Sequence, residues 1–208
     1  MLYKYIIENY KEAEPIFFSD INVEGISKPA LNQQLATLCK NGKLTKYDKG
    51  IYYLPKKTAM HSTVGPSADM VARYRFVIRK GEIVGYYTGN AFANQIGIST
   101  QVPRVVEIVS NNTNSSPREV EIGNRIFYVR KPIEDINGEN VYVLQMLDLL
   151  KDLDDYLDYG YEDARKRFSD YIHKHGIKRM DVDKYIRKFP TRIFKNFYEL
   201  EMDHVLTY

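Results

Sequence analysis

Amide, hydroxyl and lysine side chains recur through residues 27–55 at spacings that put many of them on one side of a helix. Asparagine and glutamine both donate and accept hydrogen bonds, which suits them to base edges, and lysine suits phosphates. Leu31, Leu35 and Leu38 share one helical face, so most polar residues between them point the other way. The candidate DNA contacts are Ser27, Lys28, Asn32, Gln33, Thr37, Lys40, Lys43, Lys46 and Lys49.

Local signals define the helix that must carry these side chains. Ser27 is a suitable N-cap, and Pro29 falls in the first turn, where its missing N–H is tolerated. Gly42 follows the last turn, as a glycine that ends a helix does. Upstream, the sequence predicts a helix over residues 2–10 and a short second helix over residues 19–25.

A short hairpin is predicted directly after this helix. Residues 44–47 and 51–54 are strand-like, and Asp48-Lys49-Gly50 between them is typical of a three-residue loop with glycine in the left-handed position. Helices followed by a two-stranded hairpin are the element order of a winged helix-turn-helix. We therefore predict such a module over residues 1–60, with the third helix in the DNA major groove and the hairpin on the backbone.

Charge is concentrated in the same stretch. Between Ser27 and Met60 there are seven lysines and one acidic residue, although the net charge of the whole chain is only +3. A local excess of this kind favours attraction to a nucleic-acid duplex. An apolar face opposite a polar face also describes ordinary surface helices, and winged helices can serve as protein-interaction adaptors, so an adaptor that binds no DNA stays an alternative.

Residues 56–66 are interpreted as a linker, and residues 66–208 as a mixed α/β domain with a helical C-terminal tail from about residue 139. The whole chain is thus predicted to be α+β. Expected helices cover 68–77, 88–95, 161–175, 181–188 and 191–206, and expected strands cover 82–87, 105–109, 120–122 and 125–129.

Small and polar residues crowd the segment around residue 95. Thr88, Asn90 and Gln101 could line a ligand pocket, which would make the chain a ligand-responsive regulator. Thr88 and Ser99 are equally typical of helix caps, and asparagines in short helices often bond locally. Both interpretations stay open.

The tail is segregated by charge. Residues 148–163 hold seven acids and one lysine, whereas residues 165–195 hold eleven basic residues and three acids. Pairing between two solvated helices, a second DNA-contacting surface, or an interface with a subunit or partner would each explain this. The basic residues of the possible second surface are Arg165, Lys166, Arg167, Lys178, Arg179, Arg187 and Lys188.

Several short motifs resemble one known family. They are Ser27-x-x-Ala30-Leu31 through Leu35-x-x-Leu38, Gly42-x-Leu44, Gly50-Ile51-Tyr52-Tyr53-Leu54-Pro55, Thr88-Gly89-Asn90-Ala91, Gly97-Ile98-Ser99-Thr100-Gln101-Val102-Pro103 and the hairpin near Ile122-Gly123-Asn124-Arg125. Over roughly residues 1–132 the chain resembles the short branch of the AbiEi-type antitoxins of bacterial type IV toxin–antitoxin, or abortive-infection, systems. The tail from Asn137 onward departs from that family in its charge arrangement.

This resemblance implies a transcriptional regulator that represses its own operon. The N-terminal winged helix would bind double-stranded DNA at the protein's own promoter. The C-terminal domain would help to counter a nucleotidyltransferase-like toxin encoded next to it. These roles are implied by the resemblance alone.

No catalytic or metal site is expected. His173 and His175 lie at i and i+2, which points them to different sides of a helix, and no phosphate-binding glycine motif is present. The single cysteine, Cys39, has no histidine near it in the sequence and allows no internal disulfide. We therefore expect a non-enzymatic protein without cofactors. With no secretory signal and no long apolar run, it should be cytoplasmic and have no membrane partner.

Overall fold

The computed structural model describes residues 1–57, 63–114 and 116–206. The fold is mixed α+β, with 46% helix and 20% strand. It divides into two compact units, Met1–Tyr74 and Arg75–Tyr208. The division falls within helix α3 (Ala68–Phe76), whereas the sequence predicted a linker over residues 56–66.

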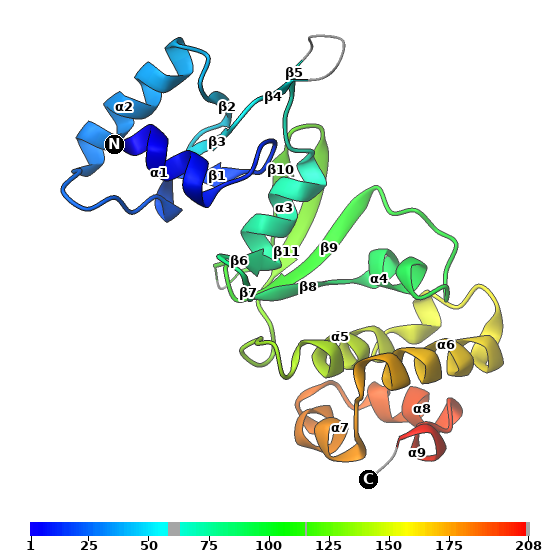
Figure 1. The fold of residues 1–208 in the computed structure, drawn as a ribbon. Coiled ribbons are helices and arrows are strands. Elements are labelled where there is room, and N and C mark those ends of the chain that lie inside the picture. The colour runs from blue at the N-terminus through cyan, green and yellow to red at the C-terminus, as the bar shows by residue number, and fades with distance from the viewer. Residues whose placement is uncertain (58–62, 115, 207–208) are drawn as a thin grey trace. The chain divides into compact units, whose positions relative to one another are not determined.

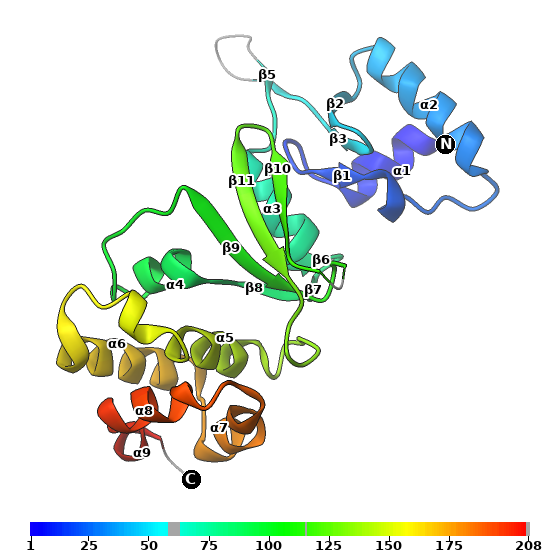
Figure 2. The ribbon, with the colours of Figure 1, turned by 180° about the vertical axis from the view of Figure 1, so that it is seen from behind.

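Residues 1–53 of the first unit form two α-helices and a small antiparallel sheet (Figures 1 and 2). The strand order is β1-β3-β2, so the predicted hairpin of β2 and β3 gains a third strand from upstream. The elements are α1 (Leu2–Asn9), β1 (Ile16–Phe17), the 3-10 helix η1 (Phe18–Asp20), α2 (Lys28–Lys40), β2 (Thr45–Asp48) and β3 (Ile51–Tyr53).

Helix α2 begins and ends as its local signals predict. The Ser27 hydroxyl accepts a hydrogen bond from the Ala30 N–H at 3.4 Å, and Gly42 has a φ of +68° just beyond the last turn. Leu31 and Leu35 are buried and Leu38 is partly buried. Their contacts with the apolar residues of α1 and β1 form the core of the unit and fix which side of α2 faces outward.

The predicted second helix over residues 19–25 is wrong. Only one 3-10 turn forms, and the chain then continues without a helix to α2. Ile16 pairs with Tyr52 and Phe17 with Ile51, so the segment just before the turn is committed to the sheet. A helix of one or two turns cannot recover its nucleation free energy without strong packing, so the long-range strand pairing prevails.

Two further details of this region differ from the sequence prediction. Asp48 pairs directly with Ile51, so the hairpin loop is the two residues Lys49-Gly50, and an irregularity lies between Lys46 and Asp48. Gly50 has the expected left-handed backbone, with a φ of +72°. The predicted linker is partly a ribbon, in which β4 (Lys56–Lys57) pairs with β5 (Thr63–Val64); its residues 58–62 lie outside the described residues.

The second unit is built on a four-stranded sheet in the order β10-β11-β9-β8. Its strands are β8 (Gly85–Thr88), β9 (Val105–Ser110), β10 (Arg118–Ile122) and β11 (Arg125–Arg130). β9 and β11 run parallel and the other neighbours antiparallel. The Gly123-Asn124 turn joins β10 and β11 as predicted. β10 forms one edge of this sheet, and its Glu119 and Glu121 side chains are exposed.

The expected strand over residues 82–87 is two strands. β7 (Glu82–Ile83) turns back to pair with β6 (Ile78–Arg79), whereas β8 pairs with β9. The chain changes partner at Val84, which belongs to neither strand. Helix α4 (Gly89–Gln95) then follows β8 as predicted.

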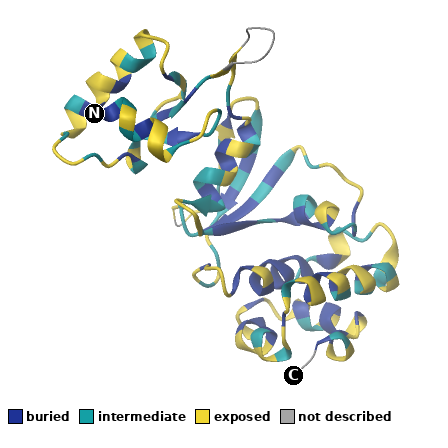
Figure 3. Ribbon diagram, in the orientation of Figure 1, coloured by how far each residue is buried: buried dark blue, intermediate teal, exposed yellow. Residues whose placement is uncertain are grey.

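Helix α5 (Val141–Leu150) is the centre of the C-terminal region and is almost entirely buried (Figure 3). It packs on β8 and also contacts α7 and α8. The other elements are η2 (Leu153–Asp155), α6 (Gly160–His175), α7 (Arg179–Tyr185), η3 (Ile186–Lys188), α8 (Arg192–Glu199) and α9 (Met202–Val205). The predicted helix 191–206 is interrupted at Glu201, where a φ of +48° separates α8 from α9.

Candidate nucleic-acid interface

The predicted contact residues lie on α2, on the turn after it and on the β2–β3 hairpin. All nine are exposed: Ser27, Lys28, Asn32, Gln33, Thr37, Lys40, Lys43, Lys46 and Lys49. The leucines on the opposite side of α2 are held in the core, so the helix cannot rotate to bury its polar face without losing that packing. Figure 3 shows the exposed colour along much of α2.

Within α2, the polar face has both fixed and free groups. The Thr37 hydroxyl donates to the Gln33 carbonyl at 2.9 Å, which holds this hydroxyl against the helix. Ser27 accepts the cap hydrogen bond, so its oxygen anchors the helix start and its own proton remains a possible donor. The side chains of Asn32 and Gln33 extend from exposed positions of a rigid helix, which suits them to read base edges.

The hairpin is fixed beside the C-terminal half of α2. Cys39 of α2 and Tyr52 of β3 pack against the same core cluster, so the helix and the hairpin lie close together. Burial raises the pKa of the Cys39 thiol, and the positive charge of Lys46 on β2 opposes part of that rise. The Asp48 carboxylate accepts from the Lys49 N–H at 2.6 Å, which ties the turn. Lys46 and Lys49 are therefore presented from a defined ribbon next to the helix.

Lys43 is the member of the set that points elsewhere. Its ammonium lies 4.8 Å from the centre of the Tyr3 ring of α1, a cation–π distance. It remains exposed, but it lies beside α1, whereas Lys46 and Lys49 lie on the hairpin.

The possible second basic surface is largely paired within the chain. Four of its seven residues have carboxylate partners: Arg165 with Glu201, Arg167 with Asp163, Arg179 with Asp183 and Asp203, and Lys188 with Glu134. Lys166, Lys178 and Arg187 are exposed. Arg192 and Lys195 of α8 also pair with Asp152 and Asp154 in the acidic segment. These contacts fit the intramolecular pairing among the three alternatives.

A buried charged network, not foreseen from the sequence, joins α5 to the sheet of the second unit. The Asp148 carboxylate is 2% exposed and accepts from the Arg130 guanidinium at 2.5 Å and from the Thr88 hydroxyl at 2.7 Å. The Lys151 ammonium lies 3.5 Å from its other oxygen. The Thr88 hydroxyl is thus bonded to Asp148 and makes no cap hydrogen bond to α4.

Glu107 lies at the margin of this network. Burial raises the pKa of the Glu107 carboxyl, Arg130 opposes that rise, and Asp148 adds to it. The carboxylate also lies against Gly89 at the start of α4, where an added Cβ would come within 2.3 Å of its oxygen. The only sequence signal for the network was the single acid, Asp148, inside the apolar run of α5.

Comparison with known proteins gives a family without an assigned role. Residues 5–147 match the model described as a family of unknown function (DUF6088), and the chain belongs to this family. No curated protein matches the chain. Each helix within residues 1–57, 63–114 and 116–206 is too short or too polar to span a bilayer. The same residues contain no cluster of three or more His, Cys, Asp or Glu side chains suited to a metal ion.

Proposed function

We propose that this member of the DUF6088 family is a DNA-binding transcriptional autorepressor and the antitoxin of a type IV toxin–antitoxin system. Its N-terminal unit acts as a winged helix-turn-helix in which the 3-10 turn η1 stands where the second helix was predicted. The observation that carries the proposal is the exposed, amide-bearing face of α2 beside a hairpin that presents Lys46 and Lys49.

In this proposal α2 enters the major groove of the promoter. Gln33 and Asn32 contact base edges, where a carboxamide pairs best with adenine because adenine offers an acceptor and a donor side by side. Lys28 and Lys40 lie near opposite ends of the helix and contact phosphates on either side of the groove. The β2–β3 hairpin is the wing and follows the adjacent backbone.

The antitoxin role has separate support. It rests on the resemblance to AbiEi-type antitoxins, which implies a nucleotidyltransferase-like toxin as functional partner. DNA binding rests on α2 and the hairpin, so either half of the proposal can fail without the other.

Base reading is tested with a labelled fragment of the protein's own promoter in a fluorescence anisotropy titration. Gln33→Ala should weaken binding by about 1–3 kcal/mol, the value of one good amide–base contact. Gln34→Ala is the matched control, because it removes another exposed glutamine, one position further along the helix and nearer to its buried face. Equal affinities for Gln33→Ala and the native chain would show that α2 does not read the promoter.

Phosphate contact is tested through salt dependence. If Lys46 and Lys49 each neutralise a phosphate, replacing either with glutamine should reduce the slope of log affinity against log salt by about one. The exposed Lys4 of α1, replaced in the same way, is the control for a lysine outside the hairpin. If the native chain leaves every duplex unshifted at low salt, the adaptor alternative is correct.

The antitoxin half is tested by genetics. A neighbouring nucleotidyltransferase-like gene, expressed alone, should arrest growth, and co-expression of this chain should restore it. Gln33→Ala should bind the promoter more weakly yet still protect, because neutralisation is assigned to the C-terminal domain. Growth arrest that persists in the presence of the native chain would refute the antitoxin role.

A further inference from the structure

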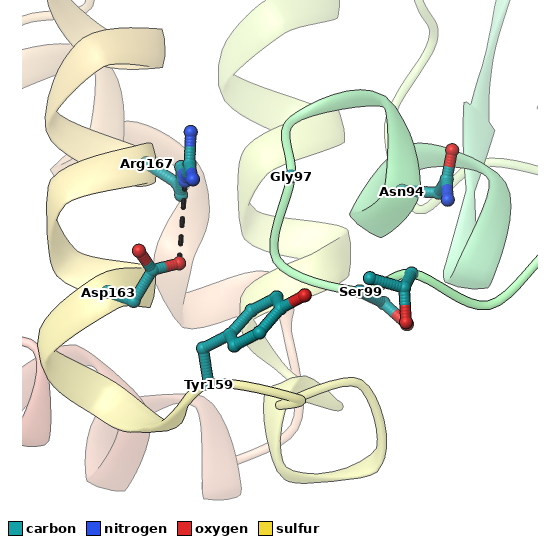
Figure 4. A pocket seen from close by; sticks show the side chains of 7 residues that line it. Asn94, Gly97, Ser99, Tyr159, Asp163 and Arg167 are labelled. Atoms are coloured by element: carbon teal, nitrogen blue, oxygen red, sulfur yellow. Dashed lines mark hydrogen bonds and ion pairs between the residues drawn. The ribbon is translucent and has the colours of Figure 1, made fainter.

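A polar pocket lies in the second unit, between α6 and the segment that follows α4 (Figure 4). Its volume is about 500 Å³, within the range of small-molecule sites. It is lined by Asn94, Gly97, Ser99, Thr100, Tyr159, Asp163 and Arg167. In Figure 4 the α6 side chains Asp163 and Arg167 stand on one side and Asn94 and Ser99 on the other, with Tyr159 between them.

One wall of the pocket is locked in place. The Asp158 carboxylate accepts from the Thr100 N–H at 2.6 Å, from the Thr100 hydroxyl at 2.8 Å and from the Ser99 hydroxyl at 3.2 Å. The Asp158 N–H donates in return to the Ile98 carbonyl at 3.4 Å. A preformed wall reduces the ordering that a ligand would otherwise have to impose.

Arg167 is held on the opposite wall with its charged end available. Asp163 accepts from Nε of Arg167 at 3.4 Å, and the Arg167 side chain is 43% exposed. Gly97 makes room for the guanidinium, because an added Cβ there would lie 3.3–3.4 Å from its atoms. An arginine anchored through Nε leaves its two terminal nitrogens as a fork for a carboxylate or phosphate.

Tyr159 supplies a flat apolar surface next to this fork. The residue is 62% exposed, so its ring is open to a stacking partner. Asn94 adds a group that can both donate and accept. Asp163 limits the total negative charge that the pocket tolerates, because it lies next to the guanidinium.

We propose that this pocket binds a small organic anion that consists of a planar ring carrying one carboxylate or phosphate. The oxyanion lies on the Arg167 fork, the ring stacks on Tyr159, and the Asn94 amide contacts a polar edge of the ring. A nucleoside monophosphate and an aromatic carboxylate share this chemistry. A triphosphate does not fit it, because Asp163 opposes the added charge. The inference does not depend on DNA binding.

The chain offers a direct reporter, since it contains no tryptophan. Tyr159→Trp keeps a flat ring at the pocket and introduces a single tryptophan into the 208-residue chain. Its emission is followed during titration with AMP, benzoate, ATP and inorganic phosphate, and calorimetry with the native chain checks that the new ring does not create the binding. We expect a saturable change with AMP or with benzoate, and weaker binding of ATP and inorganic phosphate.

Arg167→Gln in the tryptophan background should reduce affinity at least tenfold. Arg165→Gln is the matched control on the same helix, since Arg165 pairs with Glu201 and does not line the pocket. Circular dichroism of both variants checks that they fold. AMP alone would identify a phosphate ligand, and benzoate alone a carboxylate ligand. The proposal fails if neither gives saturable binding, if inorganic phosphate binds as tightly as both, or if Arg167→Gln binds like its control.

Discussion

Removal of the Asp148 carboxylate should destabilise the second unit more than any change to its surface ion pairs. Asp148 is 2% exposed and receives hydrogen bonds from Arg130 and Thr88, with Lys151 also close by. Asp148→Ala would leave the Arg130 guanidinium and the buried Thr88 hydroxyl without their shared acceptor, whereas Lys151 keeps its ion pair with Asp152. The cost of leaving buried polar groups unpaired, rather than the lost attraction between the charges, determines the expected fall in stability.

The magnitude follows from how well water can replace the carboxylate. Breaking a fully buried pair costs about 3–5 kcal/mol. The side chains of Arg130 and Lys151 are 24% and 17% exposed, so both can gain some hydration. We therefore expect the lower end, about 3 kcal/mol, for Asp148→Ala. Asp148→Asn should lie between this value and the native protein, because its amide oxygen can still accept from Thr88.

Thermal unfolding followed by circular dichroism measures the effect, and hydrogen exchange at the amides of β9 and α5 assigns it to the second unit. A change of 3 kcal/mol corresponds to a fall in Tm of roughly 10 °C for a unit of this size. Asp154→Ala is the control, since Asp154 pairs with Lys195 and accepts from the Tyr161 hydroxyl at the surface, and its loss should stay below about 1 kcal/mol.

A combined variant distinguishes the loss of the Arg130–Asp148 ion pair from the loss of packed side-chain volume. Arg130→Met, Asp148→Leu and Thr88→Val together remove the Arg130–Asp148 pair and the buried hydroxyl, while Lys151 keeps Asp152 as its partner, and we expect stability near that of the native chain. If Asp148→Ala is no worse than Asp154→Ala, the network contributes nothing and the reasoning is refuted. Equal losses in Asp148→Ala and the triple variant would point to packing instead of charge.

Three further changes test other parts of the molecule. Ser27→Ala should destabilise the first unit by about 1 kcal/mol in urea unfolding, because the α2 cap is lost, and an unchanged midpoint would contradict the cap. Burial raises the pKa of Glu107, so the native state prefers its protonated form and loses stability as the pH rises through that raised value. Glu107→Gln should therefore raise Tm at pH 7, and this gain in Tm should shrink toward about pH 4. A gain that is the same at every pH would show that titration of Glu107 is not its cause. Burial lowers the pKa of His175 in the folded state, so the unfolded chain takes up a proton first and stability falls as the pH drops below the ordinary pKa of histidine. The Tm of the native chain should therefore fall between about pH 7 and 5, and the Tm of His175→Gln should change less over the same range.

Elements with strong local signals were predictable from the sequence. Ser27 and Gly42 bound α2 as expected, and the Gly123-Asn124 turn gives the predicted hairpin. The exposure of the predicted contact residues also follows from local spacing, because the buried leucines determine the outer face. DNA contact itself stays a prediction.

Features that depend on distant partners were not predictable. The segment after Pro15 joins the sheet because of its pairing with Tyr52 and Ile51, which no local pattern announces. The Thr88–Asp148 contact spans 60 positions and the Thr100–Asp158 contact 58, so neither the buried network nor the pocket could be read from neighbouring residues.

The charged edge strand β10 of the second unit should affect how the protein aggregates at high concentration. β10 leaves one side of its backbone without a neighbour in the four-stranded sheet, and Glu119 and Glu121 stand exposed along it. A second molecule that docked there would bring like charges together, which disfavours fibril-like growth from this edge. A Glu119→Gln, Glu121→Gln variant lacks these charges and this protection, so its concentrated stocks should turn cloudy before those of the native chain.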